Sequence, residues 1–203
     1  MEKMKKNNYP GKFIVIEGLD GSGHSTQVSF LKDHLSAILT KEPTKDSLAG
    51  KKIKKILEKE EVISPFELQK LFTADRKEHL ENVIIPALEK GNIIISDRYS
   101  FSSFAYGSSD GLDLDQLIEM NQDFLLPDIT IILKVAPELC LERIEQRGTP
   151  VTLFEKVEKL EKVWSGYKEF PNKFDHVYLV DGEKSIEEVF NEIKSLIFLK
   201  LNI

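Results

Sequence analysis

The chain has 203 residues, of which 41% are hydrophobic and 31% are charged, a balance usual for a globular domain. This balance excludes a disordered or collagen-like chain, and the single cysteine, Cys140, excludes an internal disulfide scaffold. The net charge of −6 argues against a nucleic-acid partner, which requires clustered positive charge. No apolar stretch approaches the roughly 20 residues of a membrane span. We therefore expect a single cytoplasmic domain over residues 1–203 that binds neither nucleic acid nor membrane.

The chain opens with a basic, polar stretch over residues 1–11, which lacks the apolar core of a signal peptide. We expect this stretch to be a flexible segment. Beyond it, short apolar runs alternate with longer amphipathic ones. The short runs are rich in β-branched residues and predict strands that are buried on both faces. They cover residues 13–16, 93–95, 129–135 and 177–180, and a further strand is expected from 37–40.

The longer runs repeat apolar residues at helical spacing and predict helices. They follow Gly23 and then cover residues 66–88, 137–147, 154–167 and 185–196. Pro86 predicts a kink or a late end of the second helix, because proline has no backbone N–H to donate. Alternating strands and helices predict an α/β fold of three layers, with a parallel sheet between helices. Ligands of such sheets bind beyond the carboxyl ends of the strands.

A glycine-rich loop follows the first predicted strand and precedes a helix. Its sequence, GLDGSGHST over residues 18–26, matches the Walker A pattern GxxxxGK[ST] except that His24 stands in place of the lysine. Glycines let the main chain approach a phosphate closely, and the helix N-terminus adds partial positive charge. The hydroxyl of Ser25 is the expected Mg²⁺ ligand. The loop therefore predicts a polyphosphate site, and a glycine-rich turn without a ligand is the alternative.

His24 is the main departure from that pattern. A lysine would bring a long, fully charged ammonium to the β- and γ-phosphates, whereas histidine is shorter and mostly neutral near pH 7. Loss of one such charge costs on the order of 3 kcal/mol of transition-state stabilisation, roughly a hundredfold in rate. The sequence leaves three interpretations open: a weakened enzyme, a binding protein that has lost catalysis, or an engineered or misread position.

A second polar cluster, Asp97-Arg98-Tyr99, directly follows the strand predicted at residues 93–95. The planar guanidinium of Arg98 suits a phosphate, because it can donate two hydrogen bonds at once. The carboxylate of Asp97 suits Mg²⁺, either directly or through water. An Asp–Arg ion pair on the surface is the alternative interpretation of the same triplet.

These motifs, taken in order, resemble the thymidylate kinases among the P-loop nucleoside monophosphate kinases. The resemblance rests on the glycine loop, on Asp97-Arg98-Tyr99 and on four further stretches. These are TKEPT at residues 40–44, LFTADR at 71–76, SSFAY at 102–106 and PELCLERIEQRG at 137–148. It extends from about Gly11 to about Ile197. It implies a P-loop NTPase fold with a lid at about residues 144–156, and a homodimer.

The resemblance also implies roles for individual residues. Phe72 would stack on the base, Arg98 would bridge the donor and acceptor phosphates, and Tyr106 would pack beside the deoxyribose. The substrate side as a whole would consist of Asp20, Lys41, Glu42, Phe72, Arg76, Arg98, Ser102, Ser103 and Tyr106. The ATP side would consist of Gly18, Leu19, Asp20, Gly21, Ser22, Gly23, His24, Ser25, Thr26 and Arg143. Asp97 and Ser25 would hold Mg²⁺.

Some members of this family carry a catalytic arginine in the glycine loop, whereas others carry arginines in the lid. Residue 21 is a glycine here, so the lid side has to supply that charge, and Arg147 is the better candidate than Arg143. The expected catalytic set is therefore Asp97, Arg98, His24 and Arg147. Lys134 and Gly107 depart from the residues usual in the family.

The sequence thus predicts an enzyme that transfers a phosphoryl group from ATP to dTMP with Mg²⁺, giving dTDP and ADP for dTTP synthesis. Because of His24, a nucleotide-binding protein of the same fold with little kinase activity is the alternative. A third possibility keeps the chemistry but changes the acceptor to another nucleoside monophosphate.

Overall fold

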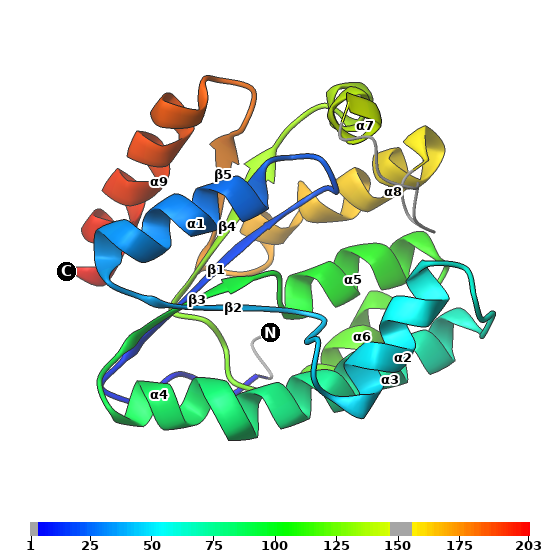
Figure 1. The fold of residues 1–203 in the computed structure, drawn as a ribbon, viewed down its shortest axis with the longest axis horizontal. Helices are drawn as coiled ribbons and strands as arrows, with labels where there is room; N and C mark the ends of the chain where they lie inside the picture. Colours follow the sequence, from blue (N-terminus) through cyan, green and yellow to red (C-terminus); the bar gives the residue numbers. More distant parts are fainter. Residues whose placement is uncertain (1–3, 147–155) are drawn as a thin grey trace.

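Five parallel strands form one central sheet in the computed structural model, which describes residues 4–146 and 156–203 (Figure 1). The strand order is β2-β3-β1-β4-β5. The strands are β1 (Lys12–Gly18), β2 (Ile38–Lys41), β3 (Ile93–Asp97), β4 (Ile129–Lys134) and β5 (Val177–Asp181). All five contain or adjoin the predicted apolar runs. The three central strands are almost wholly buried, because helices cover both faces of the sheet.

The two faces of the sheet carry separate apolar layers. On one face, Ile14 and Ile16 of β1 pack with Val28 of α1 (His24–Leu35) and Ile193 of α9 (Ile186–Leu201). The other face is covered by the remaining helices, whose core is rich in phenylalanine. They are α2 (Leu48–Leu57), α3 (Pro65–His79), α4 (Ile85–Glu89), α5 (Ser100–Ser109), α6 (Leu114–Asn121), α7 (Pro137–Gln146) and α8 (Val157–Tyr167). The predicted three-layer α/β fold is confirmed.

The predicted helix over residues 66–88 is three consecutive segments. The α3 helix passes into a π-helical turn at Leu80–Ile84 and then into α4, whose second residue is Pro86. The wider turn lies directly before the proline, which cannot donate a backbone hydrogen bond. The start of α3 has a side-chain cap, since Ser64 Oγ accepts from Glu67 N, and Pro65 occupies the first turn.

Residues 4–11 lie against the body of the domain instead of forming a free segment. Lys5 N donates to Phe124 O at 2.9 Å, and Leu126 N donates to Lys5 O at 2.7 Å. Asn7 Nδ2 donates to Asp128 Oδ2 at 2.7 Å. We expected a flexible segment, but from residue 4 onward these hydrogen bonds hold the stretch against the domain. The partners lie in the loop after α6, about 120 residues away in the chain. The local sequence of residues 4–11 therefore could not predict these contacts.

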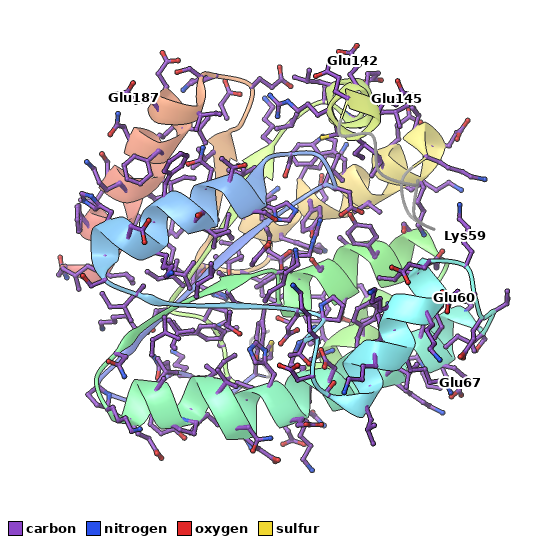
Figure 2. The ribbon with its side chains drawn as sticks, in the orientation of Figure 1. Lys59, Glu60, Glu67, Glu142, Glu145 and Glu187 are labelled. Carbon is purple, nitrogen blue, oxygen red and sulfur yellow. The ribbon has the colours of Figure 1, made fainter. Side chains whose placement is uncertain are left out.

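The helices predicted from apolar spacing do not include α2, α5 or α6. The α5 sequence SFSSFAYGSS contains five serines and a glycine, which are weak helix formers, and its stability comes from burial of Phe101 and Phe104. Charged side chains such as Glu67, Glu142 and Glu187 project from the outer helix surfaces (Figure 2). None of the helices in the described part of the chain is long and apolar enough to cross a bilayer. A single short 3-10 helix, Phe170–Asn172, precedes β5 in that same part.

Candidate functional site

The glycine loop joins β1 to α1, as its sequence predicts. Gly21 and Gly23 have φ angles of 85° and 93°, which residues other than glycine rarely adopt. At Gly23 an added Cβ would meet nothing within 4 Å, so the main chain is open to a ligand. At Gly21 an added Cβ would lie 2.3 Å from Cys140 O of α7. An arginine at residue 21 is therefore sterically excluded here, and the loop itself cannot supply that charge.

The carboxyl ends of β1 and β3 bring the two predicted motifs together. Parallel pairing places Ile16 opposite Asp97, so the Asp-Arg-Tyr triplet begins beside the glycine loop. Asp97 Oδ2 accepts from Ser25 Oγ at 2.7 Å and from Lys41 Nζ at 3.0 Å, and Oδ1 lies 2.5 Å from His24 Nδ1. Burial acts to raise the pKa of Asp97, but the electrostatic interaction and hydrogen bond with His24, together with the charges of Lys41 and Arg98, hold it far below its ordinary value. Asp97 is therefore ionised.

The ring of His24 is buried between Asp97 and Arg98. Arg98 Nη2 lies 3.0 Å from Nε2, and a guanidinium can only donate, so Nε2 carries the lone pair. The ring proton is then on Nδ1, which donates to Asp97. Burial and the charge of Arg98 lower the pKa of His24 despite the nearby Asp97 and Asp20 carboxylates. His24 is consequently neutral, and the positive charges at this edge are Lys41 and Arg98.

Arg98 connects the glycine loop to the neighbouring cavity. Its Nη1 donates to Gly18 O at 2.8 Å and to Ser102 Oγ at 3.0 Å, and its Nη2 donates to Asp20 Oδ1 at 2.7 Å. The backbone at Arg98 has φ 74°, a left-handed conformation that is unfavourable for an L-residue. It is held by hydrogen bonds from Arg98 N to Ile16 O and from Ser96 Oγ to Arg98 O. Such strain persists where the surrounding structure enforces it, commonly at functional sites.

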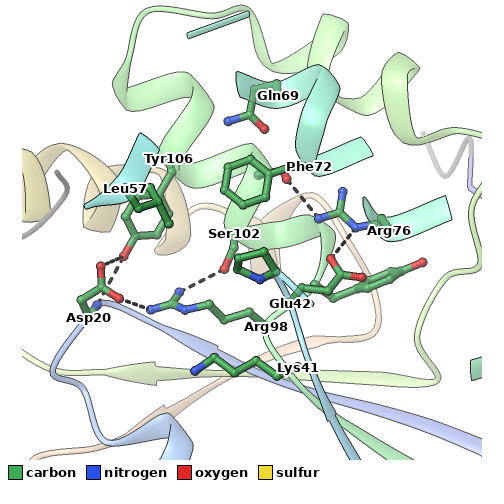
Figure 3. Close-up of a pocket in the computed structure, with 13 residues that line it drawn as sticks. Asp20, Lys41, Glu42, Leu57, Gln69, Phe72, Arg76, Arg98, Ser102 and Tyr106 are labelled. Carbon is green, nitrogen blue, oxygen red and sulfur yellow. Dashed lines mark hydrogen bonds and ion pairs between the residues drawn. The ribbon is translucent and has the colours of Figure 1, made fainter. Parts of the chain in front are cut away.

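A cavity of about 270 Å³ opens beside Arg98 (Figure 3). All nine residues predicted for the substrate side line it. The others are Pro43, Leu57, Gln69 and Tyr99. Tyr99 belongs to the quoted triplet and Pro43 to the TKEPT stretch, so both had a signal in the sequence. Gln69 had only its helical spacing from Phe72, and Leu57 had none.

The inner wall of this cavity is a buried ionic network around Arg76, which is 1% exposed. Arg76 Nε donates to Glu42 Oε2 at 2.8 Å, Nη1 to Asn121 Oδ1 at 2.5 Å and Nη2 to Ser103 Oγ at 3.1 Å. His79 contacts the other oxygen of Glu42 at 3.0 Å. Glu42 therefore orients Arg76 at the inner wall of the cavity. Neither Asn121 nor His79 was predicted for the site.

A second cavity of about 290 Å³ lies on the other side of the glycine loop. Ser22, Gly23 and Thr26 of the loop line it together with Arg143 of α7. Four residues near the end of β5 and the start of α9 also line it: Gly182, Lys184, Ile186 and Val189. Arg143 Nη1 donates to Ser22 O at 3.3 Å. Its position beside the loop suits the donor side of the site, so Arg143 is not a detached surface charge. Arg147 and most of the expected lid lie outside the described residues.

Glu17 anchors the start of α5 beneath the site. The carboxylate is completely buried and accepts from Tyr99 N, Ser102 N, Ser102 Oγ and Tyr167 Oη at 2.5–3.1 Å. Burial raises the pKa of Glu17, although these bonds and Arg98, 4.0 Å away, act in the opposite direction. Ser102 is thus held by Glu17 on one side and Arg98 on the other.

This raised pKa predicts a pH-dependent effect of Glu17→Gln on stability. The folded state binds the Glu17 proton more tightly than the unfolded state, so the stabilisation is complete below about pH 4.5 and is lost as pH rises through the folded pKa. The variant lacks this titration. We expect the free energy of unfolding of the wild type, relative to Glu17→Gln, to fall as the pH rises above about 4.5. Urea unfolding at several pH values measures it, and parallel curves for the two proteins would contradict it.

Comparison with known proteins places this geometry in a family. A sequence model of the thymidylate kinases matches residues 16–193, which include both motifs and the whole cavity. The chain belongs to the thymidylate kinase family. It is 40% identical over 198 residues to a probable thymidylate kinase of Pyrococcus horikoshii, covering 92% of this chain and 96% of that protein. A thymidylate kinase of Caldicellulosiruptor saccharolyticus is 34% identical over 197 residues, again covering 92% and 96%.

A solved member of the family has the same fold. The structure of thymidylate kinase from Candida albicans superposes with a TM-score of 0.81 at 30% identity, covering 97% of this chain and 95% of that one. That structure was described as showing the origin of broad substrate specificity in the Candida enzyme. The P-loop NTPase fold predicted from the sequence is confirmed.

Proposed function

We propose that this protein transfers the γ-phosphoryl group of ATP to dTMP, giving dTDP and ADP. The position of Arg98 carries the proposal. Its guanidinium contacts the glycine loop through Gly18 and Asp20 and the nucleotide-sized cavity through Ser102. A cation between a polyphosphate loop and an acceptor cavity is placed where charge develops during phosphoryl transfer. Family membership supports the same activity.

The glycine loop and the start of α1 bind the donor in this proposal. Main-chain N–H groups and the positive end of the helix dipole attract the β- and γ-phosphates. Because His24 is neutral, Arg98 and Lys41 supply the positive charge that a loop lysine gives elsewhere. Arg143 and the second cavity would accommodate the nucleoside end of ATP.

The acceptor lies in the cavity lined by Phe72, with its phosphate toward Arg98. An aromatic face such as Phe72 gives a base a large stacking area. Tyr106 Oη donates to Asp20 Oδ2 at 3.1 Å, which fixes the ring as a wall for the sugar. An oxygen of the acceptor phosphate then attacks the γ-phosphorus in line, the bond to the bridging β–γ oxygen breaks, and ADP leaves. No covalent enzyme intermediate is required.

Ser25 and Asp97 are the residues that would hold Mg²⁺. No cluster of three His, Cys, Asp or Glu side chains able to hold a metal ion occurs in residues 4–146 or 156–203. A hydroxyl and an ionised carboxylate within 2.7 Å of each other nevertheless suit a cation that takes its other ligands from phosphates and water. When bound, the ion would neutralise charge on the transferred phosphoryl group.

Three further assignments belong to the same proposal. The lid is placed at residues 144–156, with Arg147 supplying positive charge over the phosphates when it closes. The protein is taken to be a single domain that forms a homodimer, as the family resemblance implies. We place its activity in the cytoplasm, a reducing compartment that suits a chain with one free cysteine. Burial raises the pKa of the Cys140 thiol to about 12, so this thiol stays protonated and unreactive.

Release of ADP, measured in a coupled assay with dTMP, dUMP, CMP and AMP as acceptors, tests the function. We expect turnover with dTMP, and turnover within about tenfold of that of His24→Lys, because Arg98 beside the histidine and Lys41 beside Asp97 already bring positive charge to this edge. If the protein phosphorylates another monophosphate but not dTMP, that monophosphate replaces dTMP as the proposed acceptor. If dTMP binds by calorimetry but neither protein forms ADP, the kinase proposal fails and a binding protein remains.

A further inference from the structure

Gln69 is a buried amide in the substrate cavity that the fold does not use. It lies on α3 one turn before Phe72, is 3% exposed and lines the cavity. Its Oε1 is inaccessible to solvent and has no hydrogen-bond partner in the described part of the chain. Leaving a buried amide without a partner costs free energy, so such groups normally find one. Rotation about the last side-chain bond would turn this oxygen toward the cavity that Gln69 lines, where a group in the ligand would provide the partner.

The other polar side chains on the cavity wall are already engaged. Arg76 uses its three nitrogens on Glu42, Asn121 and Ser103. The remaining groups pair within the protein: Asp20 with Arg98 and Tyr106, Lys41 with Asp97, Ser102 with Glu17, and Tyr99 Oη with Leu125 O. Among the wall residues that the structure describes, Gln69 therefore has an amide oxygen that is still without a partner and is available to a ligand.

The geometry of α3 places this amide beside the base. Residues 69, 72 and 76 share one face of the helix because they are three and four positions apart. Gln69 and Arg76 consequently lie on either side of the Phe72 ring (Figure 3). A base stacked on Phe72 would be approached by Arg76 from one side and by Gln69 from the other.

Gly107 of α5 leaves room for the Gln69 side chain. A Cβ at residue 107 would lie 2.8 Å from Leu117 Cδ1 and 3.3 Å from Gln69 Nε2. The first distance requires the end of the Leu117 side chain to shift, and the second is tighter than most Cβ contacts. A larger residue at position 107 would therefore crowd the amide, and the glycine leaves it room.

We propose that Gln69 recognises the polar edge of the acceptor base. A primary amide presents an acceptor and a donor side by side. This pattern is complementary to the ring N–H and adjacent carbonyl oxygen of a pyrimidine-2,4-dione, the ring type of thymine and uracil. Gln69 is thus a specificity-determining residue of the acceptor site, and this assignment rests on the proposed function.

Replacing Gln69 with methionine, which is apolar and of similar length, tests the assignment. We expect KM for dTMP to rise about tenfold, which corresponds to about 1.4 kcal/mol, while kcat stays within about threefold and KM for ATP is unchanged. The melting temperature should stay the same or rise, because an unpaired buried amide is removed. Loss of affinity without loss of stability is the signature that a merely structural glutamine would not give.

Thr130→Val is the matched control. Thr130 is completely buried in β4, its Oγ1 also lacks a partner in the described part of the chain, and it does not line the cavity. This variant should match Gln69→Met in stability and leave KM for dTMP unchanged. An unchanged KM in folded Gln69→Met would overturn the assignment, as would failure of that variant to fold.

Calorimetry with dTMP separates this assignment from the proposed function. If the wild type binds dTMP without phosphorylating it, and Gln69→Met weakens that binding about tenfold, Gln69 keeps its role and the kinase proposal falls. If the wild type phosphorylates dTMP and both variants bind it equally, only the role of Gln69 is lost.

Discussion

Replacing Arg98 with lysine is expected to lower kcat for dTMP phosphorylation by roughly 10²–10³, although the positive charge is retained. A lysine has one ammonium and cannot reach Gly18 O and Ser102 Oγ on one side and Asp20 on the other, as the two Nη groups of Arg98 do. Positioning and charge stabilisation are most of the catalysis in phosphoryl transfer, so a misplaced cation is nearly as costly as an absent one.

A coupled ADP-release assay at saturating ATP and dTMP measures this effect. Lysine adopts the left-handed backbone at position 98 no less readily than arginine, so little change in melting temperature is expected from strain. Calorimetry with ATP serves as the control for an intact glycine loop. A stable variant that binds ATP and retains kcat within threefold of the wild type would show that the fork of Arg98 is not required.

Replacing Arg76 with alanine is expected to destabilise the fold by about 3–5 kcal/mol, because it removes one partner of a buried ion pair. Glu42, which is 3% exposed, would keep His79 as its hydrogen-bond partner among the described residues, and Asn121 and Ser103 would lose their donors. For a chain of this size the melting temperature should fall by roughly 6–20 °C. Calorimetric or circular-dichroism melting measures the change.

Two comparisons make this result specific. Lys70→Ala removes a cation from an exposed ion pair with Glu67 on the same helix, and it should leave the melting temperature nearly unchanged. Arg76→Met combined with Glu42→Gln leaves no unpaired charge and should recover part of the lost stability. A melting temperature for Arg76→Ala equal to that of Lys70→Ala would refute the structural role of the network.

The neutral state of His24 shows how far a motif can be interpreted without its surroundings. The Walker A pattern correctly indicated the loop, the strand before it and the helix after it, because those depend on local glycines and apolar runs. The protonation of His24 depends on Asp97 and Arg98, more than 70 residues away. That contact exists only once β1 and β3 pair side by side.

The same division applies to the cavity. The substrate residues came from stretches whose order resembles a family, and the parallel sheet brought them to one edge. The residues that hold them in place come from other segments. Asn121 lies on α6, a helix that the sequence analysis did not predict. Glu17 lies on β1, and nothing in the sequence indicated a function for its carboxylate. Gln69 had no signal except its spacing from Phe72.

The sequence by itself determined the layered α/β fold, the strands of the sheet and the phosphate loop, since each follows from local periodicity or backbone freedom. Only the tertiary structure decided the charge state of His24, the pairing of Arg76 with Glu42 and the contacts of residues 4–11. Those properties depend on burial and on charges supplied by segments distant in the chain, and neither quantity exists until the chain has folded.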